Sequence, residues 1–144
     1  MITLEEERLR EIRRHGVTDY PYECCGLLLG RFEKDGGKVV LETYPISNAR
    51  EESAKRNRFL IQPEELLKGE RYARSRKLEV VGFYHSHPNH PAAPSAYDLE
   101  HAWPNFSYVI ISVNAAVPGA ITVWHLKDDR SAFEQGELIC PTES

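Results

Sequence analysis

Apolar residues near the start of the chain recur with the spacing of a helix. Leu4, Leu9 and Ile12 are separated by charged residues, and Gly16 follows them. This spacing predicts an amphipathic helix over residues 3–15 that ends at Gly16. A continuous apolar segment, residues 24–30, then predicts a strand that is buried on both faces.

Turn and cap signals divide the middle of the chain. The Asp-Gly-Gly sequence at 35–37 predicts a hairpin turn, and the β-branched and aromatic residues of 38–44 predict the strand after it. The charged segment 50–58 is expected to form a loop, and residues 59–61 a short strand. A helix is predicted over residues 63–77, because a proline stands at its first position and apolar residues follow at helical spacing.

The second half of the chain is predicted to hold strands around one short helix. We expect strands over 78–87, 106–113 and 120–126, an edge strand within 131–139, and a helix over 95–102 with Ser95 as its N-cap. Trp103 and Trp124 are expected in or near the core. The order of the elements predicts an α+β fold, in which one mixed β-sheet lies between helices in a three-layer α/β/α arrangement.

Length and charge narrow the class of protein. The chain has 144 residues, 41% of them hydrophobic and 28% charged, which fits one globular domain over residues 1–144. Its net charge of −4 argues against a general affinity for nucleic acid or anionic membranes. The charged first residues lack the apolar core of a signal peptide, and three cysteines do not make a paired disulfide framework. We therefore expect a cytoplasmic protein whose partner is a protein or a small molecule.

The strongest chemical signal is a pair of histidines at the end of the predicted strand 78–87. Side chains at i and i+2 of a strand project from the same face, so His85 and His87 are expected to stand side by side. Pro88 cannot donate a hydrogen bond to a sheet, so the strand is expected to stop there, with both imidazoles at its open end. The pair forms a two-point chelate for a metal ion.

Asp98 supplies a third ligand of a suitable kind. It lies in the first turn of the predicted helix 95–102, and the loop 89–94 is long enough to fold that helix back over the strand end. Two histidines and a carboxylate are typical protein ligands of catalytic zinc, which keeps a fourth position for water. Zinc lowers the pKa of that water to about 7, so the pattern favours a hydrolase. The same three ligands also bind Fe(II), and a non-haem iron enzyme is an alternative.

A hydrolytic metal site also needs a base that is not itself a ligand. Glu23 is the candidate, because it begins the apolar segment whose strand is expected to neighbour the histidine strand. Ser95 is a candidate to donate a hydrogen bond to the tetrahedral oxyanion. The alternative for Ser95, helix capping alone, is equally compatible with its position.

Other reactive side chains have simpler interpretations. His90 is an alternative ligand, but its place in the loop favours contact with substrate or solvent. His101, one helical turn after Asp98, is a candidate to contact the ligands rather than the metal. Cys24 and Cys25 are compatible with a thiol nucleophile, although burial as small apolar residues is the favoured interpretation.

The combination of Glu23 with His85-Ser86-His87-Pro88, six residues, Ser95, two residues and Asp98 resembles the JAMM (MPN+) zinc metallopeptidase family. The resemblance implies an MPN/JAMM fold of the cytidine deaminase-like type. It also implies that His85, His87 and Asp98 bind Zn²⁺, that Glu23 is the general base and that Ser95 stabilises the oxyanion. A non-catalytic MPN scaffold is the alternative within this fold, but such scaffolds have lost the ligands, and all five motif residues are present here.

The family resemblance also indicates a class of substrate. Its members cleave peptide or isopeptide bonds next to the C-terminal glycine of ubiquitin or ubiquitin-like proteins. This short chain is more similar to compact prokaryotic members that act on ubiquitin-like sulfur-carrier proteins. The resemblance implies a substrate protein with a Gly-Gly tail, no nucleic-acid or membrane partner, and a monomer or homodimer. The sequence leaves the leaving group open among a cysteine, a peptide extension and a lysine side chain.

Overall fold

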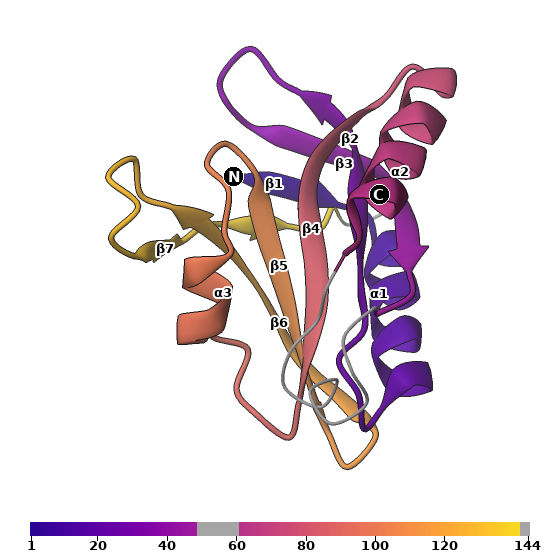
Figure 1. Ribbon diagram of the computed structural model, residues 1–144, viewed down its shortest axis with the longest axis vertical. Helices are drawn as coiled ribbons and strands as arrows, with labels where there is room; N and C mark the ends of the chain where they lie inside the picture. Colours follow the sequence, from indigo (N-terminus) through magenta and orange to yellow (C-terminus); the bar gives the residue numbers. More distant parts are fainter. Residues whose placement is uncertain (49–60, 142–144) are drawn as a thin grey trace.

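A computed structural model describes residues 1–48 and 61–141 of the chain (Figure 1). Most of the predicted loop 50–58 and strand 59–61 lies outside these described residues. Ile61, the described end of that segment, is not part of a strand.

One mixed sheet organises the described chain. Its eight strands have the order β7-β6-β5-β4-β2-β3-β1-β8. In chain order they are β1 (Ile2–Leu4), β2 (Cys25–Phe32), β3 (Lys38–Ile46), β4 (Glu79–Pro88), β5 (Ser107–Asn114), β6 (Val117–Leu126), β7 (Phe133–Gln135) and β8 (Leu138–Ile139). The central strand β4 pairs antiparallel with β2 and parallel with β5. Seven consecutive buried positions show that β5 is covered on both faces.

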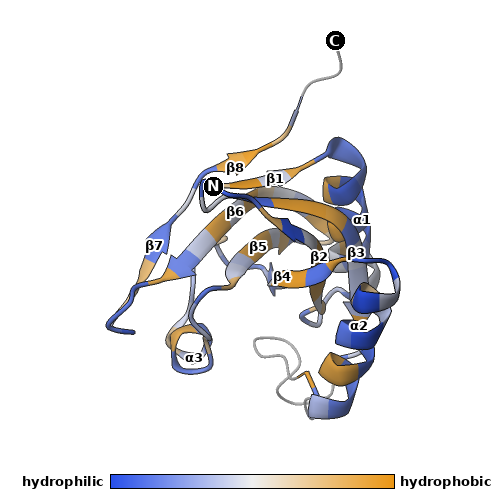
Figure 2. Ribbon diagram, turned by 90° about the horizontal axis from the view of Figure 1, so that it is seen from above, coloured by the Kyte–Doolittle hydropathy of each residue, from blue (hydrophilic) through white to orange (hydrophobic). Residues whose placement is uncertain are grey.

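Within the described part of the chain, three helices cover the two faces of the sheet, which confirms the predicted α+β arrangement (Figure 2). They are α1 (Glu6–Asp19), α2 (Pro63–Ser75) and α3 (Ala96–Glu100). Leu9 and Ile12 of α1 pack with Val81 on one face. On the other face, Ala73 of α2 packs with Phe83, and the residues around α3 join the same cluster. The apolar stripe of each long helix therefore meets the sheet, and its charged residues face outward.

The N-terminal prediction is wrong at both ends of the helix. Residues 2–4 form β1, which pairs with β3 on one side and β8 on the other, so strand pairing overrides helical spacing there. Helix α1 begins at Glu6 and continues through Gly16 to Asp19. A Cβ on Gly16 would lie 3.0 Å from Cγ2 of Val113, so this glycine permits close packing of the helix against β5 instead of ending the helix.

The C-terminal segment draws the two edges of the sheet together. One edge strand was expected within 131–139, but the segment forms two, and these lie at opposite edges of the sheet with only Gly136 and Glu137 between them. The amide of Gly136 donates to the carbonyl of Val123 in β6 at 2.8 Å, and the carbonyl of Glu137 accepts from the amide of Ile2 in β1 at 2.9 Å. The sheet is therefore curled, and β7 and β8 cover the outer edges of β6 and β1.

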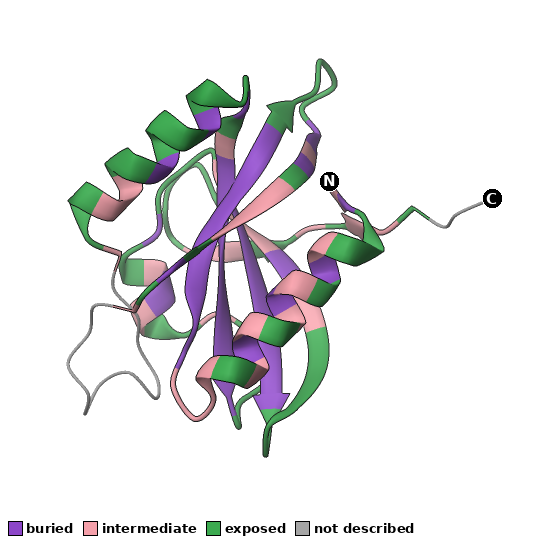
Figure 3. Ribbon diagram, turned by 90° about the vertical axis from the view of Figure 1, so that its right-hand side faces the viewer, coloured by how far each residue is buried: buried purple, intermediate pink, exposed green. Residues whose placement is uncertain are grey.

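Buried residues concentrate in the central strands, and exposed residues line the outer sides of the helices (Figure 3). The strand predicted for residues 24–30 is buried over its first six positions as β2. Trp103 departs from expectation: it is 63% exposed, so its assignment to the core is wrong.

No helix within 1–48 or 61–141 is long and apolar enough to cross a membrane.

Candidate metal centre

Strand β4 carries His85 and His87 on the same face, as the two-residue spacing predicts. Both side chains are buried, and their ring centroids lie 4.9 Å apart. Cys25 of β2 pairs with His85, so the residues just before β2 lie beside the histidine pair. Pro88 is the last residue of β4, in agreement with its inability to donate to a sheet.

Helix α3 brings Asp98 to the histidines. Ser95 is the N-cap: its hydroxyl accepts from the Asp98 amide at 3.0 Å, and Asp98 Oδ2 accepts from the Ser95 amide at 2.9 Å. This reciprocal capping box fixes the carboxylate as well as the start of the helix. The loop between Pro88 and Ser95 folds back over the strand end, as its length predicts.

Three side-chain atoms form a tight triangle. The His85 Nε2–His87 Nε2 distance is 3.1 Å, and Asp98 Oδ2 lies 3.3 Å from the first nitrogen and 3.1 Å from the second. Ligands about 2.0–2.1 Å from a tetrahedral zinc ion are roughly 3.3–3.4 Å from one another, so the triangle matches one face of that tetrahedron. The donor set and its spacing therefore fit Zn²⁺.

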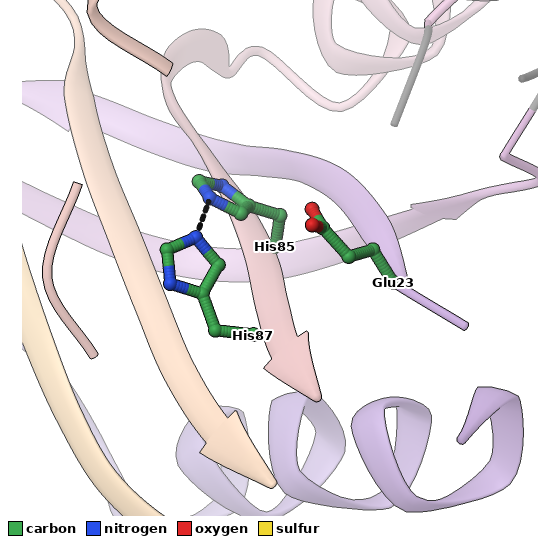
Figure 4. A group of neighbouring side chains, drawn as sticks. All are labelled: Glu23, His85 and His87. Carbon is green, nitrogen blue, oxygen red and sulfur yellow. Dashed lines mark hydrogen bonds between the residues drawn. The ribbon is translucent and has the colours of Figure 1, made fainter. Parts of the chain in front are cut away.

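Glu23 faces the same site from the chain entering β2 (Figure 4). Its carboxylate and the two imidazoles offer metal-binding atoms that all lie within 4.8 Å of one another. Glu23 is 3% exposed, and its Oε1 is buried without a hydrogen-bond partner among the described residues. Burial, followed by repulsion from Asp98, raises the pKa of Glu23 to about 9. A positive charge at the triangle would offset both the burial of the Glu23 carboxylate and its repulsion from Asp98, and would favour the ionised form of Glu23.

Asp98 is held in the opposite protonation state. Burial alone would raise its pKa, but the attraction of His85, the close contacts of Asp98 Oδ2 with His85 and His87, and the hydrogen bond from the Ser95 amide outweigh burial. These contacts hold the pKa of Asp98 far below its usual range. The two buried carboxylates thus differ, with Asp98 ionised and Glu23 ready to hold a proton.

The chain matches a family over residues 5–127, and that family is described as prokaryotic homologs of the JAB domain. The chain belongs to this family. The match covers every motif residue from Glu23 to Asp98 and confirms the resemblance to prokaryotic JAMM proteins.

Relatives and solved structures agree with this assignment to the JAB family. The chain is 36% identical over 105 residues to the desampylase of Haloferax volcanii, covering 72% of each protein. It is 32% identical over 106 residues to a probable TtuB-protein conjugate cleaving protease of Thermus thermophilus, covering 74% of this chain and 66% of the relative.

The solution structure of a Desulfitobacterium hafniense protein is similar to this JAB domain with a TM-score of 0.86 at 33% identity, covering 99% of this chain and 94% of that one. A Salinibacter ruber protein gives a TM-score of 0.77 at 41% identity, covering 98% and 92%.

A backbone contact that the sequence did not reveal orients His87 in the JAB domain. His87 Nδ1 lies 3.0 Å from the Pro91 carbonyl oxygen, which can only accept, so Nδ1–H is the donor. In the neutral ring this leaves the Nε2 lone pair facing the triangle, which is the form that binds a metal. The contact uses a main-chain oxygen, so no residue type at position 91 could have indicated it.

A largely apolar cavity of about 430 Å³ opens beside the triangle of the JAB domain. His85 and Asp98 form its inner wall, and Trp103 stands at its exposed rim. The other lining residues come from the start of α2 and the residues before it, the middle of β4, the start of β5, and α3 with its C-cap: Ile61, Pro63, Leu66, Phe83, Tyr97, His101 and Tyr108. A substrate chain therefore has an apolar approach to the site.

The other reactive side chains considered in the sequence, two histidines and two cysteines, either lie outside the triangle or are buried in an unreactive form. His101 bonds through Nδ1 to the Tyr97 carbonyl at 2.9 Å and lines the cavity, and His90 is exposed. Cys24 and Cys25 are completely buried, and burial raises the pKa of the Cys24 thiol to about 12. The interpretation of both cysteines as packing residues agrees with this burial.

Proposed function

We propose that this chain is a cytoplasmic, zinc-dependent peptidase or isopeptidase that hydrolyses the bond after the C-terminal glycine of a ubiquitin-like or sulfur-carrier protein. The observation that carries the proposal is the triangle of two imidazole nitrogens and one carboxylate oxygen, with the buried carboxylate of Glu23 beside it. The names of the desampylase and of the conjugate cleaving protease support a ubiquitin-like substrate.

His85, His87 and Asp98 are proposed to hold Zn²⁺. Bound zinc would polarise the scissile carbonyl and lower the pKa of water at the site. Asp98 brings one negative charge, held in place by the Ser95 amide, and His87 is oriented by Pro91. These supporting bonds keep the three donor atoms aimed at one point before any ligand arrives.

Glu23 is proposed as the general base. It lies beside the histidines without the hydrogen-bond contact to them that Asp98 makes, so its carboxylate is available to accept a proton from the attacking water. Burial raises its pKa to about 9, and positive charge placed beside it brings that value back toward neutrality. Glu23 can then pass the proton to the leaving amine.

Ser95 is proposed to stabilise the oxyanion of the tetrahedral intermediate in addition to capping α3. The Ser95 hydroxyl oxygen accepts a hydrogen bond from the Asp98 amide. A hydroxyl that accepts a hydrogen bond can still donate its own hydrogen to another group. Capping and oxyanion stabilisation are therefore compatible in one side chain. The cavity next to His85 and Asp98 offers a path for the substrate tail.

A mass measurement with defined substrates tests the function. The zinc-loaded protein is incubated with ubiquitin-like carriers whose Gly-Gly tail is extended by cysteine, extended by a peptide, or joined to a lysine side chain. We expect at least one of these to lose mass back to the terminal glycine, and a chelator to prevent it. Intact substrates in all three cases would favour a non-catalytic scaffold, and oxygen-dependent activity with iron would favour an iron enzyme.

A further inference from the structure

Ser86 stands between the two histidines of β4 but serves the opposite face of the sheet. Alternation along the strand turns its side chain away from the face that carries His85 and His87. It is fully buried there, next to α1, where a Cβ on Gly16 would lie 3.6 Å from the Ser86 Cβ. Ser86 therefore has no direct path to metal or substrate.

The Ser86 hydroxyl replaces a main-chain bond of the sheet. Its Oγ accepts from the Cys24 amide at 2.8 Å, and the Ser86 amide donates to the Cys24 carbonyl at 3.2 Å. A regular antiparallel pair of this kind exchanges two main-chain bonds. Here the hydroxyl takes the role of the Ser86 carbonyl, and the regular ladder of β2 begins one residue later, at Cys25. The backbone leaves the sheet at the residue that follows Glu23.

A second side chain holds the backbone of Glu23 itself. Asn48 Nδ2 donates to the Glu23 carbonyl at 3.1 Å. The Glu23 carboxylate, in contrast, has a buried Oε1 without a hydrogen-bond partner among the residues described. With no hydrogen bond to Oε1 from the described residues, the direction of this carboxylate depends in part on its backbone, and Ser86 and Asn48 hold that backbone on either side of the peptide between residues 23 and 24.

We propose that Ser86 and Asn48 are positioning residues that aim the Glu23 carboxylate at the metal triangle. The proposal rests on the proposed function, in which Glu23 is the general base. A base must lie within hydrogen-bond reach of the proton it removes, and a displacement of about 1 Å can lower the rate by about 10²-fold. The hydroxyl of Ser86 acts on catalysis through Cys24 and Glu23, without contact with the substrate.

Amide exchange in the zinc-loaded protein tests the backbone contact without any activity. Ser86→Ala leaves the Cys24 amide without its acceptor, so we expect this amide to exchange at least about ten-fold faster by NMR. Ser86→Thr retains the hydroxyl and should restore the protection. Ser107→Ala is the matched control, because Ser107 is equally buried but its hydroxyl faces Lys38. Unchanged Cys24 exchange in Ser86→Ala would overturn the proposal.

Kinetics of the same variants test the effect on Glu23. Ser86→Ala should keep its zinc and its KM while kcat falls by about 10- to 100-fold, and Ser86→Thr should recover most of kcat. Asn48→Ala, at a less buried position, should lower kcat in the same way. This variant tests the proposal if Ser86→Ala does not fold. Full kcat in both alanine variants, or an equal loss in Ser107→Ala, would overturn the proposal. A wild-type protein that cleaves no carrier would instead overturn the proposed function, while amide exchange would still decide whether Ser86 holds this backbone.

Discussion

Glu23 combines burial, proximity to two histidines and a carboxylate oxygen that has no hydrogen-bond partner among the described residues. If it is the base and not a ligand, Glu23→Gln should keep zinc bound and lower kcat by about 10²- to 10⁴-fold, because the amide cannot accept the proton of water. Zinc content and kcat are measured on the same sample. Loss of zinc in this variant would place Glu23 among the ligands.

Ser95 has two proposed roles that different substitutions separate. Ser95→Asn keeps a good N-cap acceptor for the Asp98 amide but removes the hydroxyl, so it should retain zinc and lose kcat, by about 10²-fold. Ser95→Ala removes the cap as well, and we expect zinc affinity to fall by about 10-fold or more. Metal titrations and kcat values for both variants give the comparison. Full activity in Ser95→Asn would leave Ser95 with the capping role alone.

The sequence predicts side chains better than the backbone atoms that support them. The spacing of His85, His87 and Asp98 was sufficient to expect them together, because strand alternation and a capped helix have fixed geometry. The Pro91 carbonyl that orients His87 has no equivalent signal, since every residue carries a carbonyl. The bond from the Cys24 amide to the Ser86 hydroxyl was missed because its donor is a main-chain amide, which every residue except proline carries.

At the scale of elements, the contact between β4 and β5 has no room for a side chain at Gly82. A Cβ there would lie 2.3 Å from the Ser107 carbonyl oxygen, which belongs to rigid backbone. Gly82→Ala should therefore lower the free energy of unfolding by about 3 kcal/mol, measured by urea denaturation. Gly119→Ala is the control, because its Cβ would lie 3.3 Å from the Ser112 carbonyl oxygen and needs only a small shift. Equal stability of the two variants would contradict the packing described for β4 and β5.

The ends of β3, β5 and β6 meet in a group of polar side chains, of which Lys38 and Ser107 are buried and His125 is half-buried. Lys38 Nζ donates to Ser107 Oγ at 2.9 Å, and this oxygen lies 3.4 Å from Nδ1 of His125. Burial, and then the positive charges of Lys38 and the N-terminus, lower the pKa of His125 to about 4.

In the unfolded chain His125 binds a proton near its ordinary pKa of 6.5, whereas in the folded chain it binds one only near pH 4. The stability due to neutral His125 is therefore complete above pH 6.5 and is lost as the pH falls toward 4. His125→Gln should flatten the pH dependence of the free energy of unfolding in this window, measured with zinc-free protein. His90→Gln, at an exposed histidine, serves as the control. The same slope in wild type and His125→Gln would show that His125 does not resist protonation in the fold.

Elements were predicted well where the local pattern and the tertiary contacts agree, as for α2 and β4. They were mispredicted where pairing partners decide. Residues 2–4 have helical spacing but form β1 because they bridge β3 and β8. The two short strands at 133–135 and 138–139 depend on edges contributed by β6 and β1, which local periodicity cannot reveal.

For the whole molecule, the curled sheet explains how distant segments form one site. Antiparallel pairing with β2 brings Glu23 to β4, and the return of α3 brings Asp98 to the same strand end. The family match, which spans residues 5–127, includes all of these elements. The cavity of about 430 Å³ at this end gives a substrate tail access to the triangle.

A zinc titration of hydrolysis tests the central claim most directly. Metal-free protein receives increasing Zn²⁺, and cleavage of a carrier with an extended Gly-Gly tail is followed by mass spectrometry. The account predicts a rate that rises in proportion to zinc and levels off at about one ion per chain, as expected for one three-ligand site. Cleavage that proceeds at full rate without metal, or zinc bound at the triangle with no cleavage of any such carrier, would contradict it.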